Sequence, residues 1–375
     1  MRILIALYKY FPYGGLQRDT VFFAKAAQAR GHSVSILTTE WDGERPDGIS
    51  LVFSKPTGWS NHARMASFER HFRELLAKGE FDVSLAMNRV AGGDFYFVAD
   101  TCMADYLPTK HSRLALALLP RYRVYLRQEA EICAQGGSIL FCIAPAQKEA
   151  YQRIYHLPEE RLFLLPPGIE SCFLRRDDAE QRRAKKRAEL GLREEDVALI
   201  LVGTNLLRKG ADRVMAAMAA CRGKRSLRFL LAGGDKPEDV SAMAKQAGVE
   251  EQMMFLGPRK DVADLLLAAD LMVHPAREEG TGTVLVEALA AGCPVICSEE
   301  CGFSPYVQEA TGTVVSAPFQ QEALDTMLRN SLDRLSELSA QTIRYAQTQD
   351  FTSRHRVAVE QMELLHHMRK RGGRP

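Results

Sequence analysis

Two glutamates flank a glycine-rich turn in the second half of the chain. Glu279 precedes Gly280-Thr281-Gly282, and Glu287 lies in the helix expected to begin near Thr283. The first backbone amides of such a helix, together with the helix dipole, favour a pyrophosphate. A carboxylate on each side of the turn can accept hydrogen bonds from sugar hydroxyls. Taken alone, the pattern also fits a capped surface helix with two solvated carboxylates.

A pair of cations follows an earlier apolar run. The strand expected over "VALILVG" ends at Gly203, and Arg208 and Lys209 precede the next expected helix. Such a pair suits a diphosphate, because arginine binds in a bidentate manner and lysine adds a point charge. An ordinary basic loop is the alternative for this stretch taken alone.

A glycine pair, Gly14-Gly15, lies between the first expected strand and the first expected helix. Nucleotide-binding folds hold a phosphate at such a turn, but the G-x-G-x-x-G fingerprint is absent. A dehydrogenase with Glu40 as its ribose ligand is the competing hypothesis. The long spacing from Gly14 to Glu40 disfavours it.

The elements that must position these residues alternate between strand-like and helix-like runs, which is typical of parallel sheets built from βαβ units. The series restarts after Pro166-Pro167-Gly168. We therefore predict two Rossmann-like domains, 1–168 and 169–345, and a C-terminal helix within 346–375 that packs back toward the first domain. Ligands of open α/β sheets bind outside the carboxyl ends of the strands, so the expected site is a cleft between the domains.

Composition restricts the class of protein. The 375-residue chain is 46% hydrophobic and 26% charged, as in a soluble globular protein, and its net charge of +2 gives no case for nucleic acid. The N-terminal apolar run is too short for a signal peptide and no run is long enough to span a membrane, which predicts a cytoplasmic protein. Cys293, Cys297 and Cys301 are regularly spaced, but their apolar neighbours favour buried thiols over a metal site.

Together, these motifs resemble the family 4 retaining glycosyltransferases of GT-B fold. The resemblance rests on "EGTG" between the glutamates, the continuation "VEALAAGCPVI", "RKG" and the glycine pair. The stretches "LYKYFPYGGLQRD", "LPPGI", "RKGADR" and "YAQTQD" are similar to the lipopolysaccharide core glucosyltransferases within that family. The resemblance implies transfer of a hexose from a UDP-sugar to an inner-core heptose of lipopolysaccharide, with no cofactor.

The resemblance also implies a role for each motif residue. Glu287 would bind the ribose hydroxyls and Glu279 the hydroxyls of the transferred sugar, while Arg208 and Lys209 would neutralise the leaving diphosphate. Thr204 stands where the family often has an arginine, so Arg208 must supply that charge. The other residues expected at the UDP-sugar are Gly14, Gly15, Asp100, Gly203, Arg259, Gly280, Thr281, Gly282 and Thr283.

Further roles follow from the resemblance. Asp19 would orient the donor or acceptor, and Asp100 would contact the outer hydroxyls of the sugar, although exposed aspartates at helix starts are commonly caps. Gly257 to Arg259 would hold uracil, largely through backbone groups. The chain has no D-x-D motif, and the implied mechanism is metal-independent front-face substitution, in which the departing phosphate takes the acceptor's proton and positive charge stabilises the leaving group.

A basic segment, residues 108–128, is expected to meet the anionic cytoplasmic face of the inner membrane, which carries the acceptor. It contains no acidic residue, and its cations are Lys110, Arg113, Arg121, Arg123 and Arg127. Its apolar face at helical spacing is formed by Leu118, Tyr122, Tyr125 and Leu126. An amphipathic helix packed on the first domain is the alternative.

Several alternatives stay open from the sequence. Glucose, galactose and galactosamine-type donors differ at one hydroxyl or an N-acetyl group, so the donor sugar is not readable. A family 4 enzyme with another lipid-linked or glycan acceptor, a non-catalytic sugar-binding protein and a sugar-nucleotide epimerase are the competing classes. The oligomeric state and the roles of Lys9, Tyr10 and Tyr13 are also open.

Overall fold

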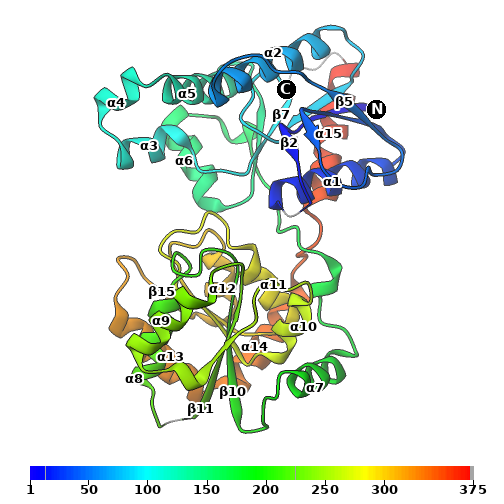
Figure 1. Cartoon of the computed structure of the whole chain (residues 1–375). Helices are drawn as coiled ribbons and strands as arrows, with labels where there is room; N and C mark the ends of the chain where they lie inside the picture. Colours follow the sequence, from blue (N-terminus) through cyan, green and yellow to red (C-terminus); the bar gives the residue numbers. More distant parts are fainter. Residues whose placement is uncertain (13, 224, 372–375) are drawn as a thin grey trace. The chain divides into compact units, whose positions relative to one another are not determined.

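The computed structural model describes residues 1–12, 14–223 and 225–371. The chain forms two compact units (Figure 1). The N-terminal unit contains Met1–Gly168 and the C-terminal segment from Ser353, and the C-terminal unit contains Ile169–Thr352. The first break therefore follows the Pro-Pro-Gly sequence directly, where the sequence predicts that the strand–helix series restarts.

The other end of the C-terminal unit differs from the predicted boundary at residue 345. Helix α14 (Leu335–Thr348) runs through this residue, and α15 (Arg354–Lys370) begins only later. The connection between them stays with the C-terminal unit because Phe351 contacts the ring of Tyr345, with centroids 6.3 Å apart, and accepts a hydrogen bond from the amide of Ile169. Helix α15 packs against α1 (Gly15–Ala29) in the N-terminal unit.

A parallel sheet of seven strands forms the centre of the N-terminal unit, in the order β5-β3-β1-β6-β7-β8-β9. Its strands are β1 (Arg2–Ala6), β3 (Ser33–Thr38), β5 (Ile49–Phe53), β6 (Val83–Ala86), β7 (Phe95–Val98), β8 (Ile139–Cys142) and β9 (Leu162–Leu164). In the interior strand β1, Ile3, Leu4 and Ile5 are at most 1% exposed. Continuous apolar character of this kind is typical of a strand that is covered on both faces.

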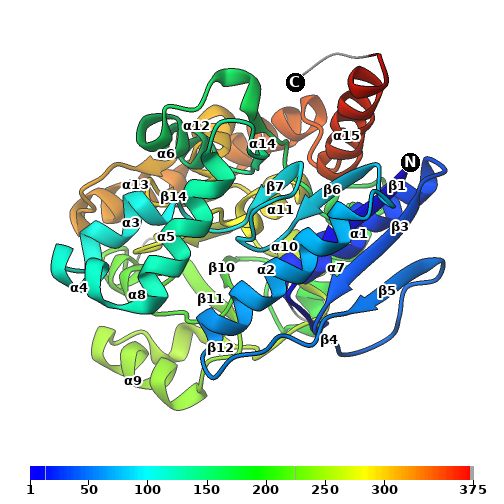
Figure 2. The same cartoon turned by 90° about the horizontal axis from the view of Figure 1, so that it is seen from above.

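Helices cover both faces of this sheet. Besides α1 and α15 they are α2 (Asn61–Ala77), α3 (Met103–Lys110), α4 (Arg113–Leu118), α5 (Pro120–Cys133), α6 (Pro145–Tyr155) and a 3-10 turn, Glu159–Arg161. Successive strand residues point to opposite faces: Ile5 packs with Phe23 of α1 and with α15, whereas Leu4 packs with Phe72 of α2. Figure 2 shows α2 beside α5, which contacts it.

A small parallel sheet pairs β2 (Lys9–Tyr10) with β4 (Glu40–Trp41). Lys9 Nζ lies 2.5 Å from Glu40 Oε2. The ring of Tyr10 stacks on Trp41, with centroids 3.8 Å apart. Glu40 is thus paired with a lysine of this small sheet, and the two side chains are 48% and 59% exposed. Tyr13 lies outside the described residues.

The basic segment 108–128 does not form the single apolar face that helical spacing predicts. It is divided among α3, α4 and α5, because Pro120 occupies the first turn of α5 and ends the preceding helix. Tyr122 turns into the unit and is 5% exposed, whereas Leu114 and Leu118 of α4 are 68% and 65% exposed. Among the described residues, none of the helices combines the length and apolar character that a membrane span requires.

The C-terminal unit contains a six-stranded parallel sheet in the order β12-β11-β10-β13-β14-β15. Its strands are β10 (Asp196–Val202), β11 (Ser226–Ala232), β12 (Met253–Phe255), β13 (Leu271–His274), β14 (Val295–Ser298) and β15 (Val314–Val315). Its other elements are α7 (Ala179–Glu189), α8 (Ala211–Ala220), α9 (Pro237–Ala247), α10 (Val262–Ala268), α11 (Thr283–Ala291), α12 (Ser304–Thr311), α13 (Gln321–Asp333), α14 and two 3-10 turns, Ser171–Phe173 and Glu250–Gln252.

Two clusters of buried residues sandwich this sheet as well. Leu199 packs with Val214 of α8 and Leu324 of α13 on one face. Ile200 packs with Leu285 of α11 on the other. Both units are therefore parallel sheets with helices on each face, which confirms the predicted α/β class with two Rossmann-like units.

Candidate active site

The loops that follow two neighbouring strands bring the charged motifs together. Lys209 lies between β10 and α8, and Glu279 lies between β13 and α11. Lys209 Nζ is 2.5 Å from Glu279 Oε2, and the two side chains are only 10% and 14% exposed. Because carboxyl ends of parallel strands meet at one edge of a sheet, residues distant in sequence form one cluster at this carboxyl edge.

The turn that carries Glu279 is held by a second turn. The amide of Gly302 donates to the Glu279 carbonyl at 3.1 Å, and the amide of Phe303 donates to the Thr281 carbonyl at 2.8 Å. A Cβ on Gly302 would stand 2.1 Å from the Gly280 oxygen, so only glycine fits. Gly282 precedes α11 with φ +75°, in the left-handed region that favours glycine.

Lys209 is positioned by the backbone beneath it. Gly203 has φ +138°, and a Cβ there would stand 2.3 Å from Lys209 Cε. The lysine stem therefore lies directly over Gly203. Gly210 caps α8 with φ +85°, and a Cβ there would stand 2.2 Å from the Pro275 carbonyl. These glycines allow the β10 and β13 loops to approach each other closely.

Arg208 and Lys209 contact the glutamate turn differently. Arg208 is 39% exposed, donates to the Glu278 carbonyl and lies 3.9 Å from Glu279 Oε2. Burial alone would raise the pKa of Glu279, but the neighbouring His274 and the Lys209 ammonium outweigh it and lower this pKa to about 2. Glu279 is thus a carboxylate at neutral pH and can act only as a hydrogen-bond acceptor.

His274 belongs to this cluster, and the sequence reasoning did not assign it a role. It ends β13, its side chain is fully buried, and Nε2 lies 3.7 Å from Glu279 Oε2. A polar residue at the end of an otherwise apolar strand, "LMVHPA", is the signal that identifies it.

The remaining predicted residues of this unit lie at the same edge. Glu287 is in α11, one turn after Thr283, and is 7% exposed. Gly257, in the loop after β12, has φ +65° and accepts a hydrogen bond from the amide of Gly233, which directly follows β11. Arg259 in that loop binds Asp261 through two hydrogen bonds of 2.8 and 2.6 Å. Its guanidinium is thus committed within its own loop, which leaves the backbone for a ligand.

The glycine pair of the N-terminal unit starts α1. Gly14 is the residue before the helix, and a Cβ there would overlap the side chain of Gln17, at 1.8 Å from its Oε1. Gly15 has no atom within 4 Å of such a Cβ. A side chain at position 14 would therefore displace Gln17 and Phe11, whereas position 15 faces open space.

Asp19 lies inside α1 and faces α15. Its Oδ1 is 2.8 Å from His355 Nε2, and its Oδ2 is 3.5 Å from Arg354. Burial tends to raise the pKa of Asp19, but the hydrogen bond from His355 and the charge of Arg354 lower it overall. These contacts join the first helix of the unit to the last one.

Asp100 contrasts with Asp19. It follows β7, its side chain is 69% exposed, and its nearest cation, Arg89, lies 3.9 Å away. The cap position of α3 is taken by Cys102. Asp100 is thus not a helix cap, and its contact with Arg89 is a long ion pair on the side of an exposed carboxylate.

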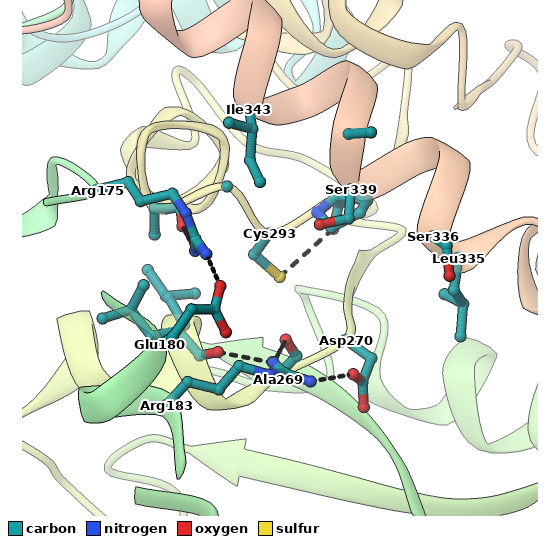
Figure 3. A pocket seen from close by; sticks show the side chains of 16 residues that line it. Arg175, Glu180, Arg183, Ala269, Asp270, Cys293, Leu335, Ser336, Ser339 and Ile343 are labelled. Carbon is teal, nitrogen blue, oxygen red and sulfur yellow. Dashed lines mark hydrogen bonds and ion pairs between the residues drawn. The ribbon is translucent and has the colours of Figure 1, made fainter. Parts of the chain in front are cut away.

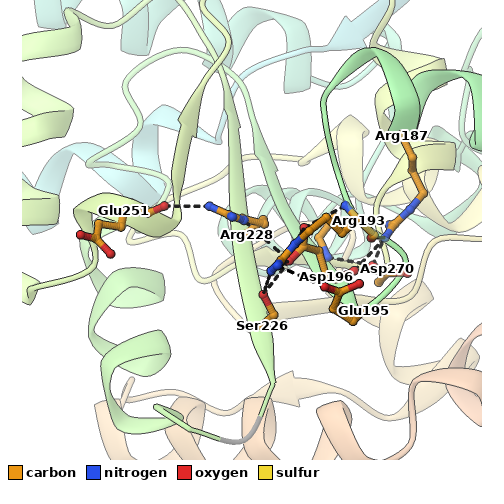
Figure 4. Close-up of polar contacts among 9 residues, drawn as sticks. Arg187, Arg193, Glu195, Asp196, Ser226, Arg228, Glu251 and Asp270 are labelled. Carbon is orange, nitrogen blue, oxygen red and sulfur yellow. Dashed lines mark hydrogen bonds and ion pairs between the residues drawn. The ribbon is translucent and has the colours of Figure 1, made fainter.

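A second charged region lies at the opposite edge of the C-terminal sheet, where the strands begin. Asp196 of β10 accepts hydrogen bonds from Arg193 and Ser226, and Asp270 before β13 pairs with Arg187 (Figure 4). Asp270 also pairs with Arg183. The hydrogen bond from Arg193 is the main reason that the pKa of Asp196 is lowered. These charges hold the amino ends of the strands.

A cavity of about 420 Å³ opens at this edge. Figure 3 shows that Arg175 points to Glu180 and that Arg183 points to Asp270 on its wall. Cys293 in this wall is 2% exposed, and burial raises its pKa to about 12, as for a packed thiol. The cavity lies away from the carboxyl edge, where ligands of α/β sheets bind.

The fold and the charged turn define a GT-B glycosyltransferase, and the comparisons with known proteins agree. The chain belongs to the family 4 glycosyltransferases: residues 13–171 match the Glycosyltransferase Family 4 domain, and residues 182–349 match the Glycosyl transferases group 1 domain. The expected family and enzyme class are thereby confirmed.

Individual relatives are similar over nearly the whole chain. Lipopolysaccharide glucosyltransferase WaaG of Escherichia coli (strain K12) is 36% identical over 362 residues, which cover 94% of this chain and 96% of that protein. A crystal structure of WaaG, described as a glycosyltransferase involved in lipopolysaccharide biosynthesis, has a TM-score of 0.84 at 34% identity, covering 96% and 99% of the two chains. A D-inositol 3-phosphate glycosyltransferase of Jonesia denitrificans is 25% identical over 391 residues, with 92% and 90% coverage.

Proposed function

We propose that this chain transfers a hexose from a UDP-sugar to an inner-core heptose of lipopolysaccharide, with retention of configuration and without a metal ion. The observation that carries the proposal is the Lys209–Glu279 pair at the carboxyl edge of the C-terminal sheet. It supports a nucleotide-sugar site because cations from the loop after β10 meet a carboxylate and helix-terminal amides from the loop after β13. The similarity to WaaG supports the acceptor.

The donor site is assigned residue by residue. Glu287 binds the ribose hydroxyls, and the backbone of Gly257 to Arg259 holds uracil. Arg208 and Lys209 bind the diphosphate, together with the amides that start α11. Glu279 accepts hydrogen bonds from hydroxyls of the transferred sugar, since it is ionised and largely buried. Gly14, Gly15 and Asp100 contribute from the N-terminal unit.

The proposed reaction is a substitution on the front face of the sugar. The acceptor oxygen bonds to the anomeric carbon while the bond from that carbon to the β-phosphate oxygen breaks. The departing phosphate takes the acceptor's proton, and UDP leaves. Arg208 and Lys209 stabilise the charge that develops on the diphosphate, which is the role a metal ion plays in other enzymes.

A donor panel tests this function. Purified protein is incubated with a truncated core acceptor and UDP-glucose, UDP-galactose or UDP-N-acetylgalactosamine, and the product is weighed by mass spectrometry. We expect a mass increase of one hexose or N-acetylhexosamine with one donor. Inositol 3-phosphate as acceptor tests the competing family 4 activity. UDP-sugar turnover with no acceptor product would contradict the lipopolysaccharide assignment, and no turnover of any UDP-sugar would contradict the donor class.

We also propose that α4 contacts the anionic membrane that carries the acceptor. Leu114, Leu118 and Leu119 are 68%, 65% and 44% exposed, and Arg113 and Arg121 flank them. Exposed leucines beside cations are typical of an interfacial helix. Co-sedimentation with vesicles tests this: binding should need anionic lipid and fall in Leu114→Ser/Leu118→Ser. Equal binding to neutral vesicles, or no binding, would contradict it.

A further inference from the structure

His274 is a buried polar side chain without a hydrogen-bond partner. It is fully buried, and neither ring nitrogen has a partner among the described residues. Buried polar groups in proteins are normally paired, and an unpaired one has a cost of about 1–3 kcal/mol. Nε2 points to Glu279 Oε2 but stands at 3.7 Å, beyond hydrogen-bond distance. The free enzyme thus holds an unused donor beside its most important acceptor.

The ring is neutral at physiological pH. Burial lowers the pKa of His274, and Lys209 and Arg208 lower it further, whereas Glu279 acts in the opposite direction. A neutral imidazole carries one N–H and one lone pair. With its proton on Nε2, it can donate a single hydrogen bond to Glu279.

The position of Glu279 Oε2 in the ligand-free structure is tied to Lys209. Glu279 Oε2 is already bound by Lys209 Nζ at 2.5 Å. The proposed function, however, needs the Lys209 ammonium at the donor diphosphate. When the diphosphate binds, it competes with Glu279 for this ammonium, and Glu279 must then keep its orientation by another contact.

We propose that His274 is a positioning residue. It donates a hydrogen bond to Glu279 when the Lys209 ammonium leaves Glu279 and binds the donor diphosphate. In the loaded enzyme, Nε2–H donates to Oε2 and holds the carboxylate where it accepts from the sugar hydroxyls. The inference rests on the proposed function, because it needs a nucleotide sugar at this turn.

The backbone around His274 is suited to such an exchange of partners. The carbonyl of His274 accepts a hydrogen bond from the Ala276 amide at 2.9 Å, and Cys301 Sγ lies 3.8 Å from it. Cys301 also forms a β-bridge with Glu279. Both residues are therefore anchored to the same segment, and the gap from Nε2 to Oε2 is only 3.7 Å.

His355 shows what a purely structural histidine looks like in this chain. It is also largely buried beside a carboxylate and an arginine, but its Nε2 is already 2.8 Å from Asp19. The hydrogen bond that a structural histidine needs is thus already formed in the ligand-free protein. His274 differs because its Nε2 stands 3.7 Å from Glu279 Oε2 while that oxygen is held by Lys209.

Three variants and two ligands test the inference. The variants are His274→Phe, His274→Gln and His274→Asn. The ligands are UDP and the UDP-hexose that the donor panel selects, with affinity measured by calorimetry and kcat by product formation. UDP lacks the sugar, so it reports the diphosphate contacts without Glu279. Gln places its amide nitrogen close to the position of Nε2, whereas the shorter Asn places it near Nδ1.

We expect His274→Phe to leave the affinity for UDP within about twofold and to weaken the UDP-hexose and kcat by about tenfold or more. His274→Gln should recover most of this loss, and His274→Asn should not. Unchanged UDP-hexose affinity and kcat in His274→Phe would overturn the inference. So would equal weakening of UDP and UDP-hexose, which a merely structural role predicts.

If His274→Phe does not fold, the two amide variants decide, because equal kcat and affinity in Gln and Asn would overturn the inference. Failure of the proposed function is recognised separately. In that case the wild-type protein itself binds no UDP-sugar, whatever the residue at position 274.

Discussion

The two edges of the C-terminal sheet carry similar charges in different states. At the amino edge, Asp196 and Asp270 are surrounded by arginine donors and backbone amides. At the carboxyl edge, one carboxylate oxygen of Glu279 is bound by the Lys209 ammonium. His274 beside it has no hydrogen-bond partner within the described parts of the chain. One edge is a closed network, and the other contains an unused donor.

Under the proposed function, this difference corresponds to charges that hold the fold at one edge and charges that bind the donor at the other. A buried carboxylate whose acceptors are all filled gains nothing from a substrate. A buried carboxylate that depends on one lysine can exchange that lysine for hydroxyl groups. The carboxyl edge is also where the helix-terminal amides of α11 point, so the incomplete network and the favourable potential coincide.

Removing Lys209 or Glu279 should have the largest effect. We expect Lys209→Ala and Glu279→Ala each to lower kcat by about 10²–10³-fold, because each removes charge stabilisation or sugar binding in the transition state. Because each variant also breaks a largely buried ion pair, the free energy of unfolding should fall by about 3 kcal/mol as well, so kcat is compared between folded proteins. Steady-state kinetics and calorimetry measure both quantities, and retained turnover in both variants would refute the site.

Asp196→Asn should show the opposite pattern. The variant weakens a charged network at the amino edge and should lower the free energy of unfolding by about 3 kcal/mol, since several hydrogen bonds lose their ionic partner. Urea unfolding measures this change. The folded variant should keep kcat within about twofold, and a loss of kcat without a loss of stability would break the contrast between the edges.

Asp19→Asn tests whether Asp19, in the N-terminal unit, behaves like the carboxylates of the amino edge or like Glu279 at the carboxyl edge. Its partners come from α15, so we expect a loss of about 2 kcal/mol in unfolding free energy and a kcat within about threefold of the wild type. This expectation differs from the catalytic role that the family resemblance implies. A hundredfold loss of kcat at unchanged stability would restore that role.

The acid dependence of stability provides a smaller test. The pKa of Glu279 is about 2 in the folded chain, below the ordinary value of 4.5. Its contribution is therefore complete well above pH 4.5 and is lost as the pH falls toward 2. Between pH 6 and pH 3.5 the wild type should lose about 1 kcal/mol more stability than Glu279→Gln. Parallel urea titrations of both proteins would show no such difference if the ion pair were absent.

Asp100→Asn should have the smallest effect. Because the side chain is 69% exposed, the free energy of unfolding should change by less than about 0.5 kcal/mol. If Asp100 contacts the sugar, the KM of the donor rises by up to about tenfold with little change in the affinity for UDP. Equal KM values in wild type and variant would remove Asp100 from the site.

Much of the architecture was readable from local sequence. Apolar runs separated by helical periodicity predict parallel sheets, and Pro166-Pro167-Gly168 marks the first break between units. The last break was not readable, because the helical pattern of α14 continues past residue 345 and only the packing of Phe351 decides where the unit ends. The single apolar face expected within 108–128 also failed, since periodicity does not reveal that Pro120 divides the helices.

The sequence by itself predicts which residues would carry the donor chemistry: the glycine turn, the two glutamates and the cations at 208 and 209 are local patterns with a local physical meaning. Only the tertiary structure decided their partners. The Lys209–Glu279 pair, the unpaired His274 and the contacts of Asp19 with α15 each join segments distant in sequence. Such contacts depend on which strands and helices become neighbours, and no local pattern encodes that.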